Sequence, residues 1–282
     1  MASSAQNFVR QYFRILKIFM NEKEIKTAFA RDGFLVCKGL FSPEEMQILL
    51  QDIKNSQRRY GKDDLTKGSM TFKSSVFFHN SRIQQFVSQQ KIIDLLKVLI
   101  GPNIWVRWDQ AVAKGPNSNT FPWHQDNNYS KLKDPHYQFW VALTESNANN
   151  GGLLLQPGSH KQNLPYRYDG YEVVYDGVPQ SPILITAEPG DVVIFSSFTL
   201  HSTTPNITQD TRWAYVIEYM SLDHYDPYVE PPYFVVARNG KSSPEFVRSY
   251  RGKNNPLSRL KYYISDLKQP QKILKKLAPR KN

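Results

Sequence analysis

Apolar and polar residues alternate in short runs through the middle of the chain. From Ile104 to about Leu222, runs rich in Val, Ile, Phe, Tyr and Trp are separated by turn clusters such as Glu188-Pro189-Gly190-Asp191. Short strands with turn signals between them are typical of an all-β sandwich or barrel and not of βαβ units. The pair Gly151-Gly152 lies between two such runs, which argues against a nucleotide-binding loop of the P-loop or Rossmann type.

The part of the chain before this region has a helical pattern. Residues 21–30 are typical of a polar helix, and Asp32-Gly33 then predicts a turn into a short strand at Phe34-Leu35-Val36. Ser42-Pro43 supplies an N-cap and a first helical residue, so we expect a helix from there to about residue 58. A further helix is predicted over residues 83–99.

Residues 1–20 carry three basic residues and no acid, and their apolar positions recur at helical spacing. Basic residues interrupt those apolar positions, so the segment lacks the apolar core of a signal peptide. We therefore expect an N-terminal helical segment over residues 1–31. A transit peptide, and a start of translation at Met20, are the alternatives.

The net charge of +11 is concentrated at the other end of the chain. Residues 238–282 contain 13 Lys or Arg and 2 acidic residues, whereas the rest of the chain is balanced. Apolar positions at helical spacing predict a basic helical extension here, suited to an anionic membrane surface or an acidic partner. A solvated helix pair resting on the body is the alternative. Because no recognition motif accompanies the charge, we expect no specific nucleic-acid partner.

Composition excludes several classes of protein. Hydrophobic residues make up 40% of the chain, too many for a disordered protein, and no run is long enough to span a bilayer. Cys37 is the single cysteine, which excludes an internal disulfide and a cysteine zinc site. It lies in an apolar run, so we expect a small buried hydrophobe in a reducing, cytoplasmic compartment.

One pair of residues suggests metal chemistry. His124 and Asp126 are two residues apart, and residues i and i+2 of a strand lie on the same face. An imidazole and a carboxylate are two parts of the 2-His-1-carboxylate triad that binds non-haem Fe(II). The best candidate for the third ligand is His201, at the end of a strand that Gly190 introduces. Eleven residues later, Arg212 opens another strand, and a hairpin of this length predicts that Arg212 lies beside His201, where it can grip a carboxylate.

Three segments together resemble the phytanoyl-CoA dioxygenase family of Fe(II)/2-oxoglutarate-dependent oxygenases. They are Trp123-His124-Gln125-Asp126, the stretch from Asn150 to His160, and the stretch from Pro189 through His201 to Arg212. The resemblance runs from about residue 32 to residue 222. It implies a double-stranded β-helix, the jelly roll of cupin-like proteins, which we place at residues 32–237.

The resemblance also implies roles for individual residues. His124, Asp126 and His201 are the expected iron ligands, and Arg212, aided by Thr203, is expected to hold the distal carboxylate of 2-oxoglutarate. Trp140 matches a position that lines the cosubstrate pocket. The remaining histidines are expected at the surface or behind the ligands, with His160 in a structural loop.

The implied activity is the oxidation, most simply the hydroxylation, of a small organic substrate in natural-product or lipid tailoring. Dioxygen and 2-oxoglutarate are consumed, succinate and CO₂ are released, and ascorbate is a stimulant to include. Related halogenases replace the ligand carboxylate with Gly or Ala, whereas this chain has Asp126. Two alternatives are a catalytically silent jelly roll that binds a ligand, and a cupin-like metalloenzyme that uses no 2-oxoglutarate.

Overall fold

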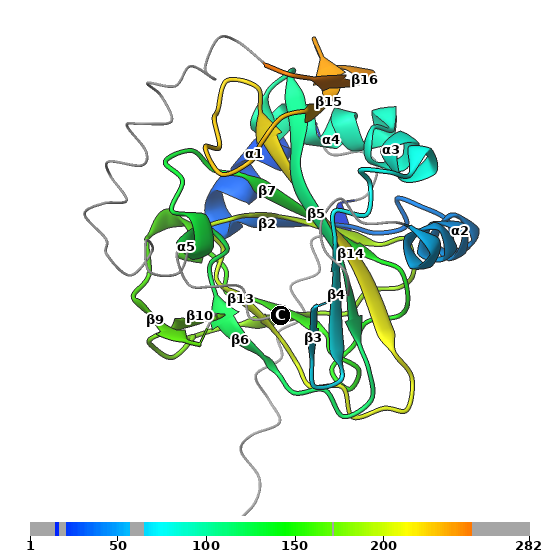
Figure 1. The fold of residues 1–282 in the computed structure, drawn as a ribbon. Coiled ribbons are helices and arrows are strands. Elements are labelled where there is room, and N and C mark those ends of the chain that lie inside the picture. The colour runs from blue at the N-terminus through cyan, green and yellow to red at the C-terminus, as the bar shows by residue number, and fades with distance from the viewer. Residues whose placement is uncertain (1–14, 17–20, 57–64, 171, 250–282) are drawn as a thin grey trace, which may run out of the picture.

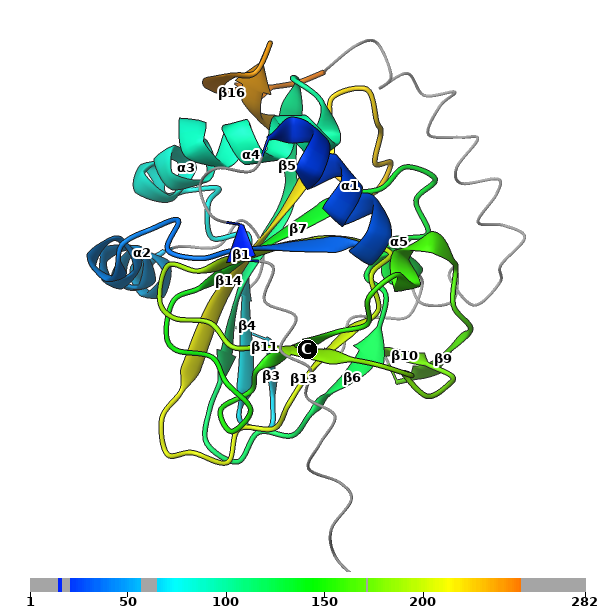
Figure 2. The same ribbon diagram turned by 180° about the vertical axis from the view of Figure 1, so that it is seen from behind.

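Two β-sheets face each other across the interior of the protein (Figures 1 and 2). The computed structural model describes residues 15–16, 21–56, 65–170 and 172–249. The predicted mainly β architecture is confirmed. Most of the predicted N-terminal helix and the tail beyond residue 249 lie outside the described residues.

The larger sheet has the strand order β1-β2-β12-β7-β14-β5-β15-β16, with β4 also beside β5 and β3 beside β4. Within the described residues its strands pair antiparallel, except that β1 is parallel to β2. The strands are β1 (Ile15–Leu16), β2 (Phe34–Cys37), β3 (Leu65–Lys67), β4 (Met70–Ser74), β5 (Ile104–Lys114), β7 (Tyr137–Ala142), β12 (Val192–Ser196), β14 (Arg212–Ser221), β15 (Tyr233–Arg238) and β16 (Lys241–Val247).

The smaller sheet has the order β11-β8-β13-β6, and a separate two-stranded ribbon pairs β9 with β10. The strands are β6 (Phe121–His124), β8 (Leu153–Leu155), β11 (Ile183–Ile185) and β13 (His201–Thr203), and those of the ribbon are β9 (Tyr166–Asp169) and β10 (Glu172–Tyr175).

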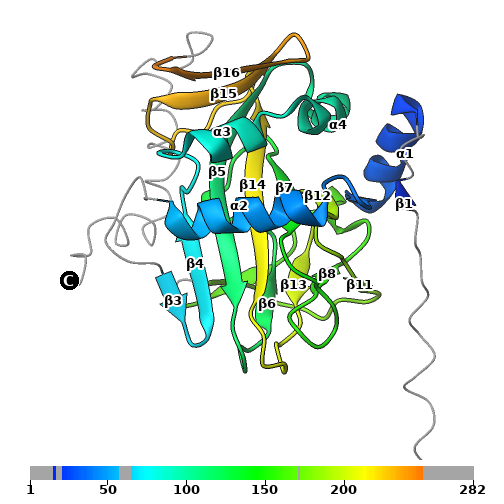
Figure 3. The same ribbon diagram turned by 90° about the vertical axis from the view of Figure 1, so that its right-hand side faces the viewer.

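Helices cover the outer face of the larger sheet, with α2 lying across its strands in Figure 3. Apolar side chains of these helices and the outward residues of β5, β7, β12 and β14 form one core. No helix in the described ranges is long and apolar enough to cross a membrane. The helices are α1 (Glu22–Asp32), α2 (Pro43–Asn55), α3 (Ser81–Val87), α4 (Gln90–Ile100), the single turn α5 (Asn127–Ser130) and the 3₁₀ turn η1 (Ser159–Lys161).

The starts of α1 and α2 follow local sequence signals, whereas the end of α3 was not predicted. Asn21 and Ser42 each form a capping box with a glutamate three residues later, which satisfies free backbone N–H groups. The single helix predicted over residues 83–99 is wrong, because α3 ends at Val87 and α4 begins at Gln90. The hydroxyl of Ser88 donates back to the carbonyl of Gln84 (2.7 Å), one of the carbonyls freed at the end of α3.

The N-terminal and C-terminal boundaries also differ from the prediction. Ile15–Leu16, assigned to a helix on the sequence, form a strand beside β2. Residues 241–247, assigned to the helical tail, form strand β16, which pairs with β15. Asn239 and Gly240 both have positive φ (51° and 74°), and Asn-Gly is the preferred two-residue hairpin turn. The predicted start of the C-terminal tail is therefore the turn of a β-hairpin.

The two faces of β14 separate the helix-covered core from the interior between the sheets. Tyr215, Ile217 and Tyr219 belong to the core beneath the helices, whereas Ala214 packs with residues of the smaller sheet. The intervening positions, including Arg212 and Glu218, follow the strand period of two and face the same side as Ala214. Polar residues of this sheet are thereby directed toward the smaller sheet.

The start of β12 is tied to β2 by a buried carboxylate. Asp191 is 3% exposed, and its oxygens accept hydrogen bonds from Lys38 Nζ (2.6 Å) and the backbone N–H groups of Gly39 (2.8 Å) and Glu188 (2.7 Å). The preceding Gly190 has φ +96°, and a Cβ there would lie 2.0 Å from the carbonyl oxygen of Phe41. The turn into β12 is therefore specified by side chain and backbone together. Cys37, which pairs with Val192, is buried as predicted.

We expect Asp191→Ala to lower the free energy of unfolding by about 3 kcal/mol, because a buried carboxylate is removed and its three donors lose their charged acceptor. Urea denaturation of the purified protein measures this change. Asp94→Ala is the control, since Asp94 pairs with Lys97 at the exposed end of α4, and its loss should cost less than about 1 kcal/mol. Equal effects of the two substitutions would contradict the proposed role of Asp191.

Candidate metal centre

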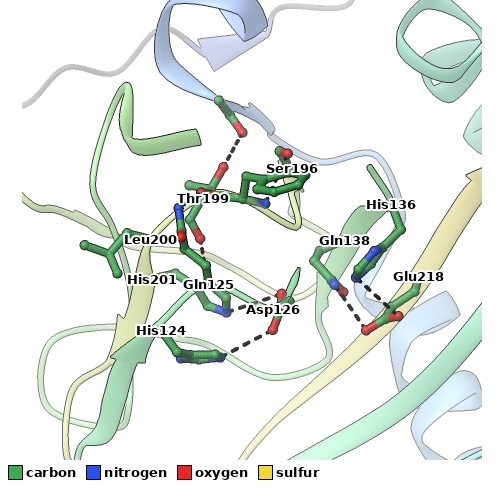
Figure 4. Close-up of polar contacts among 12 residues, drawn as sticks. His124, Gln125, Asp126, His136, Gln138, Ser196, Thr199, Leu200, His201 and Glu218 are labelled. Carbon is green, nitrogen blue, oxygen red and sulfur yellow. Dashed lines mark hydrogen bonds and ion pairs between the residues drawn. The ribbon is translucent and has the colours of Figure 1, made fainter. Parts of the chain in front are cut away.

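Two histidines and one aspartate converge between the sheets (Figure 4). His124 ends β6 and His201 begins β13, and the two are direct partners in the antiparallel pairing of these strands. Asp126 lies two residues beyond His124, past the end of the strand and at the start of α5. One ligand atom from each residue lies within 4.8 Å of the others. The predicted convergence of these three side chains is therefore present in the structure.

Backbone carbonyls orient both imidazole rings. His124 Nδ1 lies 2.8 Å from the carbonyl oxygen of Pro122, and His201 Nδ1 lies 2.9 Å from that of Thr199. A carbonyl only accepts hydrogen bonds, so these contacts assign the ring proton to Nδ1 and leave Nε2 with its lone pair. The Nε2 atoms of His124 and His201 lie 3.4 and 3.7 Å from the carboxylate of Asp126. This is the arrangement in which imidazoles bind a metal.

The electrostatics of the cluster favour the metal-binding protonation states. Burial alone would raise the pKa of Asp126, but the neighbouring His201 and His124 outweigh it and hold that pKa below its usual range. Burial, together with His124, lowers the pKa of His201 to about 4. At neutral pH the centre therefore contains an ionised carboxylate and a neutral His201, and metal ligands must be deprotonated in this way.

Gln125 anchors the backbone between His124 and Asp126 through its side-chain amide. Its amide nitrogen donates to the carbonyls of Phe198 and Gln162, and its amide oxygen accepts from the backbone N–H of Leu164 (3.1 Å). The side chain is 1% exposed. Because Gln125 lies between His124 and Asp126, these contacts fix the direction in which both ligands point.

Arg212 reaches the interior from the opposite sheet. The sequence predicted it beside the strand of His201, but β13 belongs to the smaller sheet and β14 to the larger, so this prediction is wrong. The connection between the two strands crosses from one sheet to the other instead of forming a hairpin. Arg212 is 2% exposed, and its Nε and Nη1 atoms have no hydrogen-bond partner in the structure. Burial lowers the pKa of Arg212 to about 10, which leaves it a cation at neutral pH.

A second basic residue, Lys114, lies beside Arg212 and was not predicted from the sequence. It is the direct partner of Arg212 across β5 and β14 and is 0% exposed. Its Nζ donates to Thr203 Oγ1 (2.9 Å) and to the carbonyl of Asn119 (2.8 Å). Burial and the charge of Arg212 lower the pKa of Lys114 to about 7. The sequence does contain a signal for this, because Lys114 lies in a strand at one of the alternate positions whose side chains point between the two sheets.

Trp140 forms part of an apolar wall on the same side. It is 4% exposed and packs in a cluster with Leu153, Leu155 and Phe195. The ring centroid of Phe195 lies 4.8 Å from that of His201. An apolar surface thus adjoins the metal ligands.

A buried polar cluster lies beyond Asp126 (Figure 4). Glu218 pairs with Arg107, accepts a hydrogen bond from Gln138 Nε2 (3.2 Å) and lies 3.7 Å from His136 Nε2. Arg107 also pairs with Asp226. Burial raises the pKa of Glu218 even though Arg107 opposes the shift. His136 is 1% exposed, so it lies in the interior and not at the surface.

Residues 29–214 match the family model described as phytanoyl-CoA dioxygenase. Peroxisomal phytanoyl-CoA dioxygenase of Rattus norvegicus is 25% identical over 235 residues, which cover 71% of this chain and 68% of the relative. Ectoine dioxygenase of Bordetella bronchiseptica is 26% identical over 230 residues, which cover 70% of this chain and 74% of the relative.

Solved structures share the fold. The non-haem α-ketoglutarate-dependent epimerase SnoN from nogalamycin biosynthesis superposes with a TM-score of 0.62 at 17% identity, covering 78% of this chain and 86% of that one. The apo form of the non-haem monooxygenase ThoJ gives a TM-score of 0.67 at 19% identity, with 89% and 98% covered. The predicted jelly-roll architecture is confirmed.

The buried His136 makes stability depend on pH. Burial lowers its pKa to about 3, with Arg107 as a further cause, whereas an unfolded histidine titrates near its ordinary value of about 6.5. Below about pH 6.5 the unfolded chain binds a proton that the folded chain does not, so stability is lost as the pH falls.

We expect His136→Gln to make this loss shallower by up to about 1.4 kcal/mol per pH unit between pH 6 and 4. Urea denaturation of the metal-free protein across this range measures the slope. His79→Gln, at an exposed position, is the control and should keep the wild-type slope. An unchanged slope in His136→Gln would show that this imidazole is not the buried neutral group.

Proposed function

The chain belongs to the phytanoyl-CoA dioxygenase family, and on this premise we propose that it hydroxylates a small organic substrate with Fe(II), 2-oxoglutarate and dioxygen. In this reaction 2-oxoglutarate is converted to succinate and CO₂. The convergence of His124, Asp126 and His201 on one point is the observation that carries the proposal. A buried guanidinium with unpaired donors on the facing sheet supports the choice of cosubstrate.

The donor set suits Fe(II). Two imidazole nitrogens and one carboxylate oxygen occupy one face of a metal ion and leave the other positions open. His124 and His201 would bind through Nε2, since their Nδ1 atoms are held by carbonyls. Bound iron supplies the redox chemistry of oxygen activation, and the protein's part is to orient the reactants and exclude water.

Arg212 is the residue we propose for the far carboxylate of 2-oxoglutarate. Its unpaired Nε and Nη1 offer donors in the planar arrangement that matches a carboxylate. Thr203 lies two residues beyond His201 and accepts a hydrogen bond from Lys114. Trp140 contributes to the apolar wall. The three residues would hold the cosubstrate in one orientation relative to the metal ligands.

Hydroxylation is favoured over halogenation because Asp126 occupies the third ligand position. The residues that follow do not suggest an acyl-CoA site. Asn127 and Asn128 are buried, and the amide of Asn127 donates to the carbonyl of Leu132 (3.1 Å) within the same loop. We therefore propose a tailoring reaction on a small natural product or lipid and do not take the substrate from the name of the family.

Two other functions remain as competing hypotheses. A silent jelly roll would bind a ligand without turnover, and a cupin-like metalloenzyme would work without 2-oxoglutarate. The unpaired donors of Arg212 disfavour the metalloenzyme that uses no 2-oxoglutarate, because a buried guanidinium without an anion is costly. An Fe(II)–2-oxoglutarate charge-transfer band, recorded anaerobically, is expected if the site binds metal and cosubstrate, and its absence would refute the proposed function.

We expect His124→Ala to abolish succinate formation from 2-oxoglutarate, since a metal ligand is lost. Arg212→Ala should raise the KM for 2-oxoglutarate about 100-fold with a smaller effect on kcat, because it removes a charge-assisted bidentate contact. Succinate release is measured with Fe(II) and ascorbate, and candidate substrates are screened for stimulation. Wild-type turnover and affinity in both variants would refute the site assignment.

The basic C-terminal segment supports a proposal about location. Residues 250–282 carry ten Lys or Arg and one Asp. We propose that this segment contacts an anionic membrane surface or an acidic partner, in a reducing cytoplasmic compartment that suits the free, buried Cys37.

We expect the full chain to sediment with liposomes that contain anionic lipid, and a chain ending at Ser249 to remain in the supernatant. The truncation retains β16, which belongs to the larger sheet. Liposomes of neutral lipid are the control, and raising the salt concentration should release the full chain, because the attraction is electrostatic. Equal sedimentation of both chains would exclude the tail as a membrane contact.

A further inference from the structure

Two buried basic side chains lie side by side in the interior without an anion. Lys114 and Arg212 are direct cross-strand partners, with 0% and 2% of their surfaces exposed. Within the described ranges, no ion pair joins either residue to a carboxylate, and no acid contributes to either shifted pKa. Like charges directly opposite each other destabilise a sheet, and burial adds to that cost. The pair is therefore incomplete without a ligand of negative charge.

The hydrogen bonds of Lys114 leave room for such a ligand. An anion beside Lys114 would favour its charged form, an ammonium with three protons to donate, of which two are directed to Thr203 Oγ1 and the carbonyl of Asn119. Thr203 lies on β13, two residues after His201. Its hydrogen bond to Lys114 therefore fixes the position of Lys114 Nζ relative to the metal ligands. Arg212 adds unpaired Nε and Nη1 donors from the adjacent strand.

The backbone is shaped to admit both cations. Gly151 has φ +98°, and a Cβ at this position would lie 2.6 Å from Lys114 Cδ and 3.4 Å from Arg212 Nη2. A side chain there would push the lysine stem aside as well as strain the backbone. Gly151 thus packs directly against Lys114 and Arg212.

We propose that Lys114 is a second cationic ligand for the far carboxylate of 2-oxoglutarate, which Lys114 and Arg212 hold together. Arg212 offers planar donors to the carboxylate, and Lys114 offers a point charge from the neighbouring strand. This inference rests on the proposed function. It explains why a lysine is buried between the sheets and why its Nζ is held by a hydrogen bond to Thr203.

The test compares two 2-oxo acids that differ only in the far carboxylate, namely 2-oxoglutarate and 2-oxopentanoate. Their dissociation constants are measured by anaerobic calorimetry with Mn(II) in place of Fe(II), so no turnover is required. We expect Lys114→Met to weaken 2-oxoglutarate about 10- to 100-fold, the range for a lost hydrogen bond between charged groups. The affinity for 2-oxopentanoate should not change, because that acid has no group for Lys114 to bind.

Lys114→Gln is the second variant, since its amide can still donate to Thr203 or to Asn119 without a charge. It should reproduce the selective loss even if Lys114→Met fails to fold. Lys97→Met, on the exposed end of α4, is the matched control for the removal of one lysine and should keep wild-type affinities.

The outcomes separate this inference from the proposed function. Wild-type protein that binds both acids equally would refute the proposed cosubstrate site itself. Wild-type protein that prefers 2-oxoglutarate, with the same preference in both Lys114 variants, would refute only the role of Lys114. Equal weakening of both acids would show that Lys114 supports the fold of the site and does not contact the carboxylate.

Discussion

The antiparallel pairing of β6 with β13 is the interaction on which the site depends. It sets His124 directly opposite His201, so two residues that lie 77 positions apart in the chain become neighbours. The carbonyls of Pro122 and Thr199 then turn both Nε2 atoms toward Asp126. A shift of one residue in this register would move one ring to the opposite face of the sheet and separate the ligands. The position of these short strands therefore determines the chemistry.

Charge is distributed unevenly between the sheets. Lys114 and Arg212 form a cationic region, the ionised Asp126 lies at the metal centre, and Glu218 with Asp226 shares the single guanidinium of Arg107 beyond it. The uncovered cations suit an anionic cosubstrate, whereas the acids are paired or suited to a metal. The interior thus places basic side chains and a candidate metal centre between the same two sheets, as the proposed dicarboxylic cosubstrate requires.

Most residues of the candidate site were predictable, because they belong to short sequence motifs with distinctive chemistry. His124 and Asp126 lie two residues apart at the end of β6, and His201 and Arg212 follow a turn that Gly190 marks. The hairpin assumed between His201 and Arg212 was wrong, since spacing along the chain does not reveal which sheet a strand joins. Lys114 was missed for a related reason: a lysine at a strand end is ordinarily solvated, and only the facing sheet buries it.

The sequence alone determined what depends on neighbouring residues: the strand-rich middle, the capped starts of α1 and α2, the turn at Gly190 and the ligand pair of His124 and Asp126. Tertiary structure alone decided which sheet β13 and β14 each join and the burial of Lys114 beside Arg212. These features depend on contacts between segments far apart in the chain. Periodicity and turn preferences describe a residue's own segment, whereas burial and strand pairing are properties of the partner that the folded chain supplies.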